Sequence, residues 1–132
     1  MDYVLRYEAA FNKFMFELLN KKDVIIFGDF QMAYTNYDLH NPEANIGKPG
    51  CLDWQRQPLA ELLEGGFQDT YRHLHPTDKK YTYWARFYNS RARGLGWRMD
   101  YTLASSKKMK VVEAEIHDKV EGSDHCPVST VI

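Results

Sequence analysis

The sequence has little cysteine, little net charge and no long run of apolar residues. Its 132 residues include two cysteines, Cys51 and Cys126, which lie far apart and form no CxxC pair. We therefore expect no disulfide framework, and reduced thiols favour an intracellular compartment. The formal net charge of −1 creates no general attraction for nucleic acid, so such binding must rely on a local patch. Charged residues interrupt the first apolar stretch, which argues against a secretory signal and against contact with a membrane.

The length and the hydrophobic pattern predict one α/β domain over residues 1–132. Hydrophobic residues make up 44% of the chain, enough for a single core. Apolar residues at helical spacing predict a first helix that ends near Asn20. A second helix is expected over 54–64, where Pro58 either starts the helix or kinks it. Residues 32–53 have the breakers of a long loop. Strands are expected at 24–27, 67–72, 80–85, 97–104, 110–117 and 127–132, an order typical of an α/β or α+β fold.

Two polar side chains follow the apolar run 24–27. Because all of that run is apolar, we expect a strand covered on both faces. Asp29 would then lie beyond the carboxyl end of a buried strand, facing the crevice where open α/β sheets bind ligands. Gln31 adds an amide that could orient a water or a phosphate oxygen. The simpler alternative for Asp29 is a turn residue after Gly28.

A carboxylate and an imidazole adjoin near the end of the sequence, at Asp124 and His125. A carboxylate can hold a histidine in one tautomer, and a charged imidazole would stabilise a pentacovalent phosphate. The two-residue period of 97–104 places Asp100 on the face opposite the apolar residues. These groups, together with Asp29, suit metal-assisted cleavage of a phosphate ester. The simpler interpretation of the Asp–His pair is a hydrogen-bonded turn.

Two other chemistries for these residues have less support. Cys126 beside His125 suggests a thiol nucleophile, but neighbouring residues on a strand point to opposite faces. A zinc site formed by His73, His75, His125 and the cysteines lacks the short paired spacings of zinc ligands.

The segment 86–98 combines four arginines and three aromatic residues without an acid. Arginine forks match phosphate oxygens, and aromatic rings stack on bases or wedge between them. We expect phosphate contacts from Arg91, Arg93 and Arg98, and base or sugar contacts from Phe87 and Trp97. The alternative is a solvated loop whose aromatic residues pack on the edge of the domain.

Taken together, several motifs resemble the exonuclease III family of abasic-site DNA endonucleases, within the endonuclease/exonuclease/phosphatase superfamily. They are distinct, colinear and spread over the whole chain. The matching stretches are Ile25–Asp29, Asp38–Pro42, Asp69–Arg72, Tyr81–Trp84, Gly96–Tyr101 and Gly122–Pro127.

The resemblance implies a role for each matching residue. Asp29 matches the carboxylate that positions or activates the attacking water, and Asp124 matches a residue at the metal site, to which Asp29 also belongs. His125 matches the histidine that contacts the scissile phosphate, and Asp100 matches the carboxylate that orients it. Tyr83, Phe87 and Trp97 match positions near the pocket for a baseless sugar or near the DNA groove. The resemblance also implies Mg²⁺ (or Mn²⁺) as cofactor and an abasic-site DNA duplex as substrate, with removal of 3′ nucleotides as a second activity.

The chain departs from the family pattern in two ways. The family motif Gly-Asp-x-Asn is here Gly28-Asp29-Phe30-Gln31, and the longer side chain displaces the amide. Displacement of about 1 Å at a reacting centre can cost about a hundredfold in rate. The match also covers only the C-terminal half of the family domain. The N-terminal half, which carries the metal-binding glutamate, has no counterpart before Met1.

The expected fold is therefore one half of a four-layer, DNase I-like α/β sandwich, a mixed sheet with helices on its outer face. Its inner face would be an apolar patch that needs a complementary N-terminal half or another protein. The first functional hypothesis is a part of a metal-dependent DNA phosphodiesterase, inactive alone. The alternative is a catalytically degenerate homologue that serves as a structural or nucleic-acid-binding subunit. A third interpretation keeps the enzyme but changes the substrate to RNA or a phosphorylated small molecule.

Overall fold

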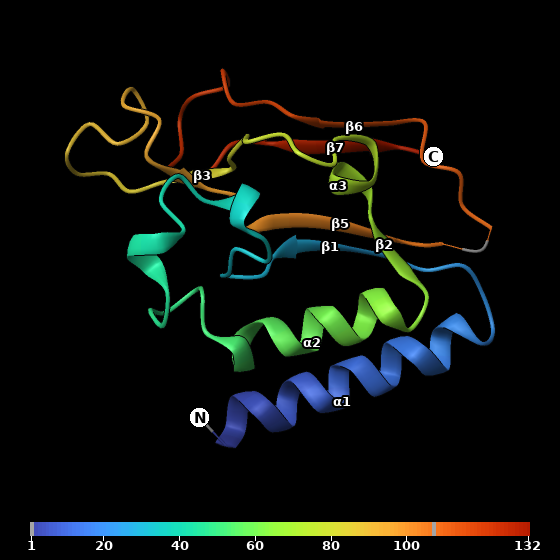
Figure 1. Ribbon diagram of the computed structural model, residues 1–132. Coiled ribbons are helices and arrows are strands. Elements are labelled where there is room, and N and C mark those ends of the chain that lie inside the picture. Colours follow the sequence, from blue (N-terminus) through green and yellow to red (C-terminus); the bar gives the residue numbers. More distant parts are fainter. Residues whose placement is uncertain (1, 107) are drawn as a thin grey trace.

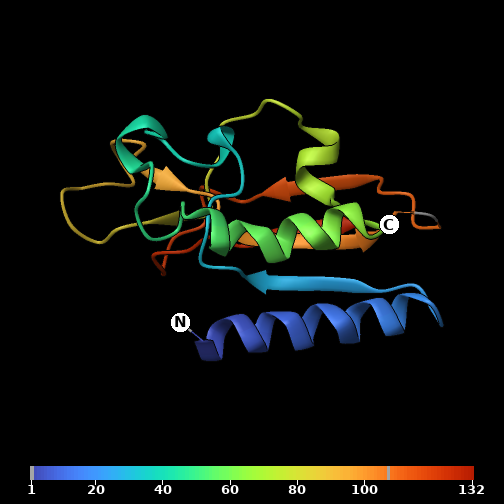
Figure 2. The ribbon, with the colours of Figure 1, turned by 60° about the horizontal axis from the view of Figure 1, so that its bottom comes forward.

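The computed structural model describes residues 2–106 and 108–132 (Figure 1). Helices α1 (Asp2–Leu19) and α2 (Asp53–Glu64) lie beside each other on one side of the sheet that contains β1 and β5 (Figure 1, Figure 2). Pro58 lies inside α2 and does not start it. Within residues 2–106 and 108–132, no helix is long and apolar enough to span a membrane.

A three-stranded antiparallel sheet forms the centre of the molecule. Its strands are β1 (Ile25–Asp29), β5 (Asp100–Ser105) and β2 (Phe67–Asp69), in the order β1-β5-β2. The face toward α1 and α2 carries the largest core cluster. Its buried members are Met15, Val24, Met32, Leu59, Leu62, Phe67, Tyr101 and Leu103.

Strand β1 differs from the prediction of a strand covered on both faces. Ile26 packs against the core, but the neighbouring Ile25 and Phe27 are 45% and 78% exposed. The physical reason is that β1 is an edge strand with helices on one face only. The apolar run therefore leaves one face of β1 open in this chain.

The second half of the chain builds two small antiparallel pairs. Strands β3 (Tyr83–Trp84) and β4 (Gly96–Trp97) form one pair, and β6 (Glu113–Ile116) and β7 (Val128–Val131) form the other. All strand pairs in the described chain are antiparallel, so the parallel component of the predicted mixed sheet is not present.

Most of the predicted strands are shorter than expected, and in two of them polar residues interrupt the strand. The predicted strand 67–72 ends at Asp69, whose side chain accepts a hydrogen bond from the Arg72 amide and begins helix α3 (Thr70–Leu74). The predicted strand 97–104 breaks after Trp97 and resumes at Asp100 as β5. Between β4 and β5 the pairing partner of the chain changes from β3 to β1.

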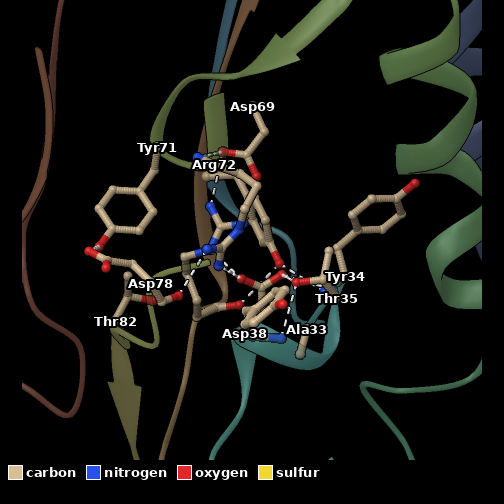
Figure 3. A network of polar contacts seen from close by, with 12 residues as sticks. Ala33, Tyr34, Thr35, Asp38, Asp69, Tyr71, Arg72, Asp78 and Thr82 are labelled. Carbon is tan, nitrogen blue, oxygen red and sulfur yellow. Dashed lines mark hydrogen bonds and ion pairs between the residues drawn. The ribbon is translucent and has the colours of Figure 1, made fainter. Parts of the chain in front are cut away.

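The predicted loop 32–53 contains two short 3-10 helices, η1 (Asn36–Asp38) and η2 (Glu43–Asn45). A buried ionic network anchors η1 to the rest of the molecule (Figure 3). Asp38 is fully buried and pairs with Arg98 and Arg72, while Arg98 also forms two hydrogen bonds to Asp69, at 3.0 and 2.6 Å. This network fixes the loop after β1 against the segment that leads into β5.

Candidate active site

Three side chains converge at one end of the central sheet. Asp29 ends β1 and Asp100 begins β5, and the antiparallel register places the two residues directly opposite each other. His125 comes from the loop that precedes β7. Ligand atoms of these three side chains all lie within 4.8 Å of one another. Of the four side chains that the sequence predicts to converge, Asp29, Asp100 and His125 therefore do so, and Asp124 is not in this group.

The imidazole of His125 is held between two carboxylates and an aromatic ring. Its Nδ1 lies 2.8 Å from Oδ2 of Asp100, and its Nε2 lies 3.9 Å from Oδ2 of Asp29. The ring of Tyr83 packs on it, with ring centroids 5.0 Å apart. Because Asp100 accepts a hydrogen bond at Nδ1, the neutral imidazole carries its proton there and leaves Nε2 as an acceptor.

Gln31 donates two hydrogen bonds to the carboxylate of Asp29. Its backbone amide donates to Oδ1 of Asp29 at 2.9 Å, and its side-chain amide donates to Oδ2. The φ angle of Gln31 is +55°, a left-handed conformation that is uncommon for a residue of this type. Gln31 therefore orients Asp29 at the cost of backbone strain. The sequence-based role, in which the amide orients a water or a phosphate oxygen, stays a prediction.

Asp124 lies beside this cluster and is not one of its three members. Its side chain pairs with Nε of Arg86 at 3.2 Å, and its backbone carbonyl accepts a hydrogen bond from the Trp84 amide. Desolvation alone would raise the pKa of Asp124, but the hydrogen bond and charge of Arg86 lower it below its ordinary value. Asp124 is thus an ionised carboxylate next to the site, and its role as a metal ligand stays a prediction.

The structure contradicts the prediction that Arg98 contacts DNA. Its side chain is 1% exposed, and its guanidinium is bound by Asp38 and Asp69. Burial alone would lower the pKa of Arg98, but the neighbouring Tyr101, Asp69 and Asp38 raise it, so the group remains a cation. The sequence around Arg98 carries no signal for this burial, because Asp38 and Asp69 are distant in the chain.

Arg91 also uses most of its hydrogen-bond donors within the protein. It donates to the backbone carbonyls of Asp118, Val120 and Ser123 and lies over the ring of Trp84. This arrangement ties the segment after β3 to the loop that contains Asp124. Arg91 therefore has few donors left for a phosphate.

Other members of the basic-aromatic segment are open to solvent. Phe87 is 65% exposed and contacts Tyr88 edge to face, and Arg93 is exposed with one hydrogen bond to a carbonyl. Tyr88 was not singled out by its sequence context, yet it is exposed and has a φ angle of +58°. Trp97 is half-buried beside Gly50, and Tyr83 lies against His125.

The two competing chemistries do not fit the geometry. Cys126 is buried, and burial raises the pKa of its thiol to about 11, so a thiolate nucleophile is not available there. Within residues 2–106 and 108–132, the only cluster of potential metal-binding side chains is the one formed by Asp29, Asp100 and His125. That cluster contains no cysteine, which argues against the zinc site.

The donor set fits a divalent cation that prefers oxygen. Asp29 and Asp100 offer carboxylate oxygens, the ligands that Mg²⁺ takes, whereas the Nδ1 atom of His125 is already bound by Asp100. Each carboxylate oxygen keeps a second lone pair beside its hydrogen bond. Two carboxylates are fewer than the ligands of an octahedral ion, so water or another segment would complete the shell.

The comparisons with known proteins agree with this geometry. Residues 3–125 match the endonuclease/exonuclease/phosphatase family profile. An exodeoxyribonuclease of Bacillus subtilis is 40% identical over 134 residues, and a DNA repair nuclease of Danio rerio, APEX1, is 33% identical over 131 residues. The matches cover 100% and 98% of this chain but 53% and 42% of those proteins, so the chain spans about half the length of these relatives.

A solved structure shows the same arrangement of elements. The 3′ phosphatase NExo from Neisseria, bound to a product DNA hairpin, superposes with a TM-score of 0.92 at 27% identity. The superposition covers 98% of this chain and 53% of that one, which confirms that the fold is about one half of a DNase I-like sandwich. The profile match over most of the sequence shows that the chain belongs to the endonuclease/exonuclease/phosphatase family.

Proposed function

We propose that this chain supplies the histidine-bearing half of a metal-dependent DNA phosphodiesterase that acts on abasic-site duplexes and on 3′ ends. The observation that carries the proposal is the convergence of Asp29, Asp100 and His125. DNA as the substrate rests on the names of the relatives, an exodeoxyribonuclease and a DNA repair nuclease.

The positions of these side chains suggest a separate role for each in the reaction. Asp29 would accept a hydrogen bond from the attacking water or bind the cation. Nε2 of His125 faces the same space and, when protonated, would donate to a phosphate oxygen as negative charge develops on it. Asp100 would hold the imidazole in place. A bound Mg²⁺ would supply charge neutralisation at the phosphate. Asp29 would be its ligand within the cluster and Asp124 a second ligand beside it, because Asp100 is already bonded to the imidazole.

We propose further that the chain needs a complementary polypeptide. Phe27 and Ile25 expose apolar surface on β1, and the chain spans about half the length of its relatives. A partner sheet on this face would bury both side chains and could add ligands for the cation. The chain alone would then have negligible activity.

A reconstitution experiment tests the proposal. The chain is incubated with Mg²⁺ and an abasic-site duplex, first alone and then with the part of the Bacillus subtilis relative that lies outside the matched region. We expect incision only in the mixture, lost in an Asp29→Asn variant. Robust incision by the chain alone, abolished by Asp29→Asn, would refute the need for a partner. No incision in either case, with the complex formed, would refute the enzyme.

One observation favours the alternative of a degenerate, nucleic-acid-binding subunit. Gln31 occupies both carboxylate oxygens of Asp29 with hydrogen bonds. If these hydrogen bonds prevent the carboxylate from binding the cation, the protein binds DNA but does not cleave it. Binding of an abasic duplex by the mixture, without incision in Mg²⁺ or Mn²⁺, would support this alternative.

A further inference from the structure

The strand break before Asp100 leaves backbone amides that need an acceptor. Up to Trp97 the chain pairs with β3, and from Asp100 it pairs with β1. At this switch the amides of Met99 and Asp100 both donate to one atom, Oγ1 of Thr82, at 2.9 and 3.1 Å. A side-chain hydroxyl therefore replaces the missing ladder partner at the start of the strand that carries Asp100.

Thr82 also contacts the segment that carries His125. It is fully buried, its carbonyl accepts a hydrogen bond from the Cys126 amide at 2.8 Å, and its amide donates to the Trp97 carbonyl at 2.9 Å. The next residue, Tyr83, packs its ring on the imidazole. One buried residue therefore links the segments on both sides of the contact between Asp100 and His125.

We propose that Thr82 is a positioning residue whose hydroxyl sets the Asp100–His125 hydrogen bond. The proposal rests on the proposed function, because only that function gives the hydrogen bond a chemical role. Without an acceptor at Oγ1, two partly buried amides must shift toward other partners, and the Asp100 carboxylate moves with its own amide. No feature of the sequence indicates this role directly, since a threonine between two tyrosines also suits an ordinary strand.

The test compares Thr82→Val, which has the same shape without the hydroxyl, with Thr82→Ser, which keeps the hydroxyl. Thr70→Val is the matched control, because Thr70 is also buried and loses one hydroxyl contact, to Thr130 at 2.9 Å. Thr70 and Thr130 belong to α3 and β7, and this hydroxyl contact involves none of Asp29, Asp100 and His125. All variants are made in the chain itself, without DNA or metal.

Two nuclear magnetic resonance measurements report on the position of Asp100. The ring ¹⁵N shifts of His125, taken at one alkaline pH, show which nitrogen carries the proton. Hydrogen exchange shows whether the amides of Met99 and Asp100 are bonded. We expect the wild type, Thr82→Ser and Thr70→Val to keep the proton on Nδ1 and to protect both amides. In Thr82→Val we expect a mixture of tautomers and exchange faster on the order of tenfold at both amides.

Three results would overturn the proposal. The first is a Thr82→Val variant with the wild-type tautomer and wild-type exchange. The second is a Thr70→Val variant that changes both as much as Thr82→Val does. The third is a wild-type chain without the Nδ1 tautomer or without protection at these amides. Because these measurements involve no cleavage, they are separate from the reconstitution assay, whose failure would refute the enzyme and leave the role of Thr82 in the hydrogen bond standing.

Discussion

Nδ1 of His125 and Oδ2 of Asp100 lie 2.8 Å apart, although 25 residues separate them in the sequence. The contact places Nε2 of the same ring toward Asp29, the residue paired with Asp100 across β1 and β5. One end of the imidazole is thus fixed by the sheet, and the other faces Asp29, where we propose that the phosphate binds.

Replacing Phe27 by serine should separate folding from association. Phe27 is 78% exposed, so we expect Phe27→Ser to change the free energy of unfolding of the chain by less than about 0.5 kcal/mol. Binding to the complementary half should weaken by roughly ten- to a hundredfold, since a large apolar side chain would no longer be buried. Isothermal titration calorimetry measures the affinity, and denaturant unfolding measures the stability.

The control for that experiment is Phe14→Ser. Phe14 is also exposed, but it lies on α1, on the helical side of the sheet. It should leave the affinity unchanged. Equal effects of the two substitutions would mean that the open face of β1 is not the docking surface.

Replacing Arg98 by methionine should destabilise the fold. The substitution leaves Asp38 and Asp69 buried without their shared cation, and breaking a buried pair costs about 3–5 kcal/mol. Arg93→Met, at an exposed position, should change the unfolding free energy by less than about 0.5 kcal/mol. Urea unfolding of both variants measures the change in the free energy of unfolding. An Arg98→Met variant as stable as the wild type would show that the network does not anchor the loop.

The chain should lose stability in acid partly through Asp38. Burial alone would raise the pKa of Asp38, but the charges of Arg98 and Arg72 outweigh it and lower the pKa. A lowered pKa in the folded state contributes stability that is present above the unfolded value of about 3.9 and is lost as the pH falls through the folded value. The unfolding free energy, measured by urea titration at several pH values, should therefore fall below about pH 4.

An Asp38→Asn variant checks this assignment. It should be less stable at neutral pH, and its unfolding free energy should depend less steeply on pH in the acid range. Asp23→Asn, at an exposed position before β1, should keep the wild-type dependence. Parallel acid profiles for the wild type and Asp38→Asn would contradict the role given to Asp38.

Shortening Gln31 should increase activity in the reconstituted enzyme. Gln31 has a φ angle of +55°, which asparagine adopts more readily, and an asparagine amide sits one methylene farther from Asp29. Gln31→Asn should therefore raise the rate of incision, by up to about a hundredfold. Single-turnover kinetics on an abasic duplex measure the effect, with Gln31→Ala as the control that removes the amide. A slower Gln31→Asn variant would show that the longer side chain suits this site.

The sequence placed the three converging residues near the ends of strands or within them. Asp29 and His125 lie just outside predicted strands, and Asp100 lies inside the predicted strand 97–104, which the structure begins at Asp100. Sheet pairing then brings Asp29 and Asp100 together. The family resemblance added the expectation of half a sandwich, which the superposition on the Neisseria enzyme confirms.

The sequence did not predict Arg98 correctly, because its burial depends on residues far away in the chain. Arg98 stands in a basic-aromatic segment that is typical of a nucleic-acid contact, yet Asp38 and Asp69 draw it into the interior. The apolar pattern of residues 24–27 missed the exposure of Phe27 for a similar reason, although the family resemblance did predict an open apolar face on the sheet. An apolar run indicates that a strand is to be covered, but it does not say which chain covers it.

A double-mutant cycle on the reconstituted enzyme tests the central claim most directly. The rate of incision of an abasic duplex is measured for the wild type, Asp100→Asn, His125→Gln and the double variant. Because Asp100 acts through His125, we predict that each single substitution lowers the rate by about 10²–10⁴-fold and that the double variant is no slower than His125→Gln. Losses that multiply in the double variant, or single substitutions without effect, would contradict the proposal that these two residues act as one unit on the phosphate.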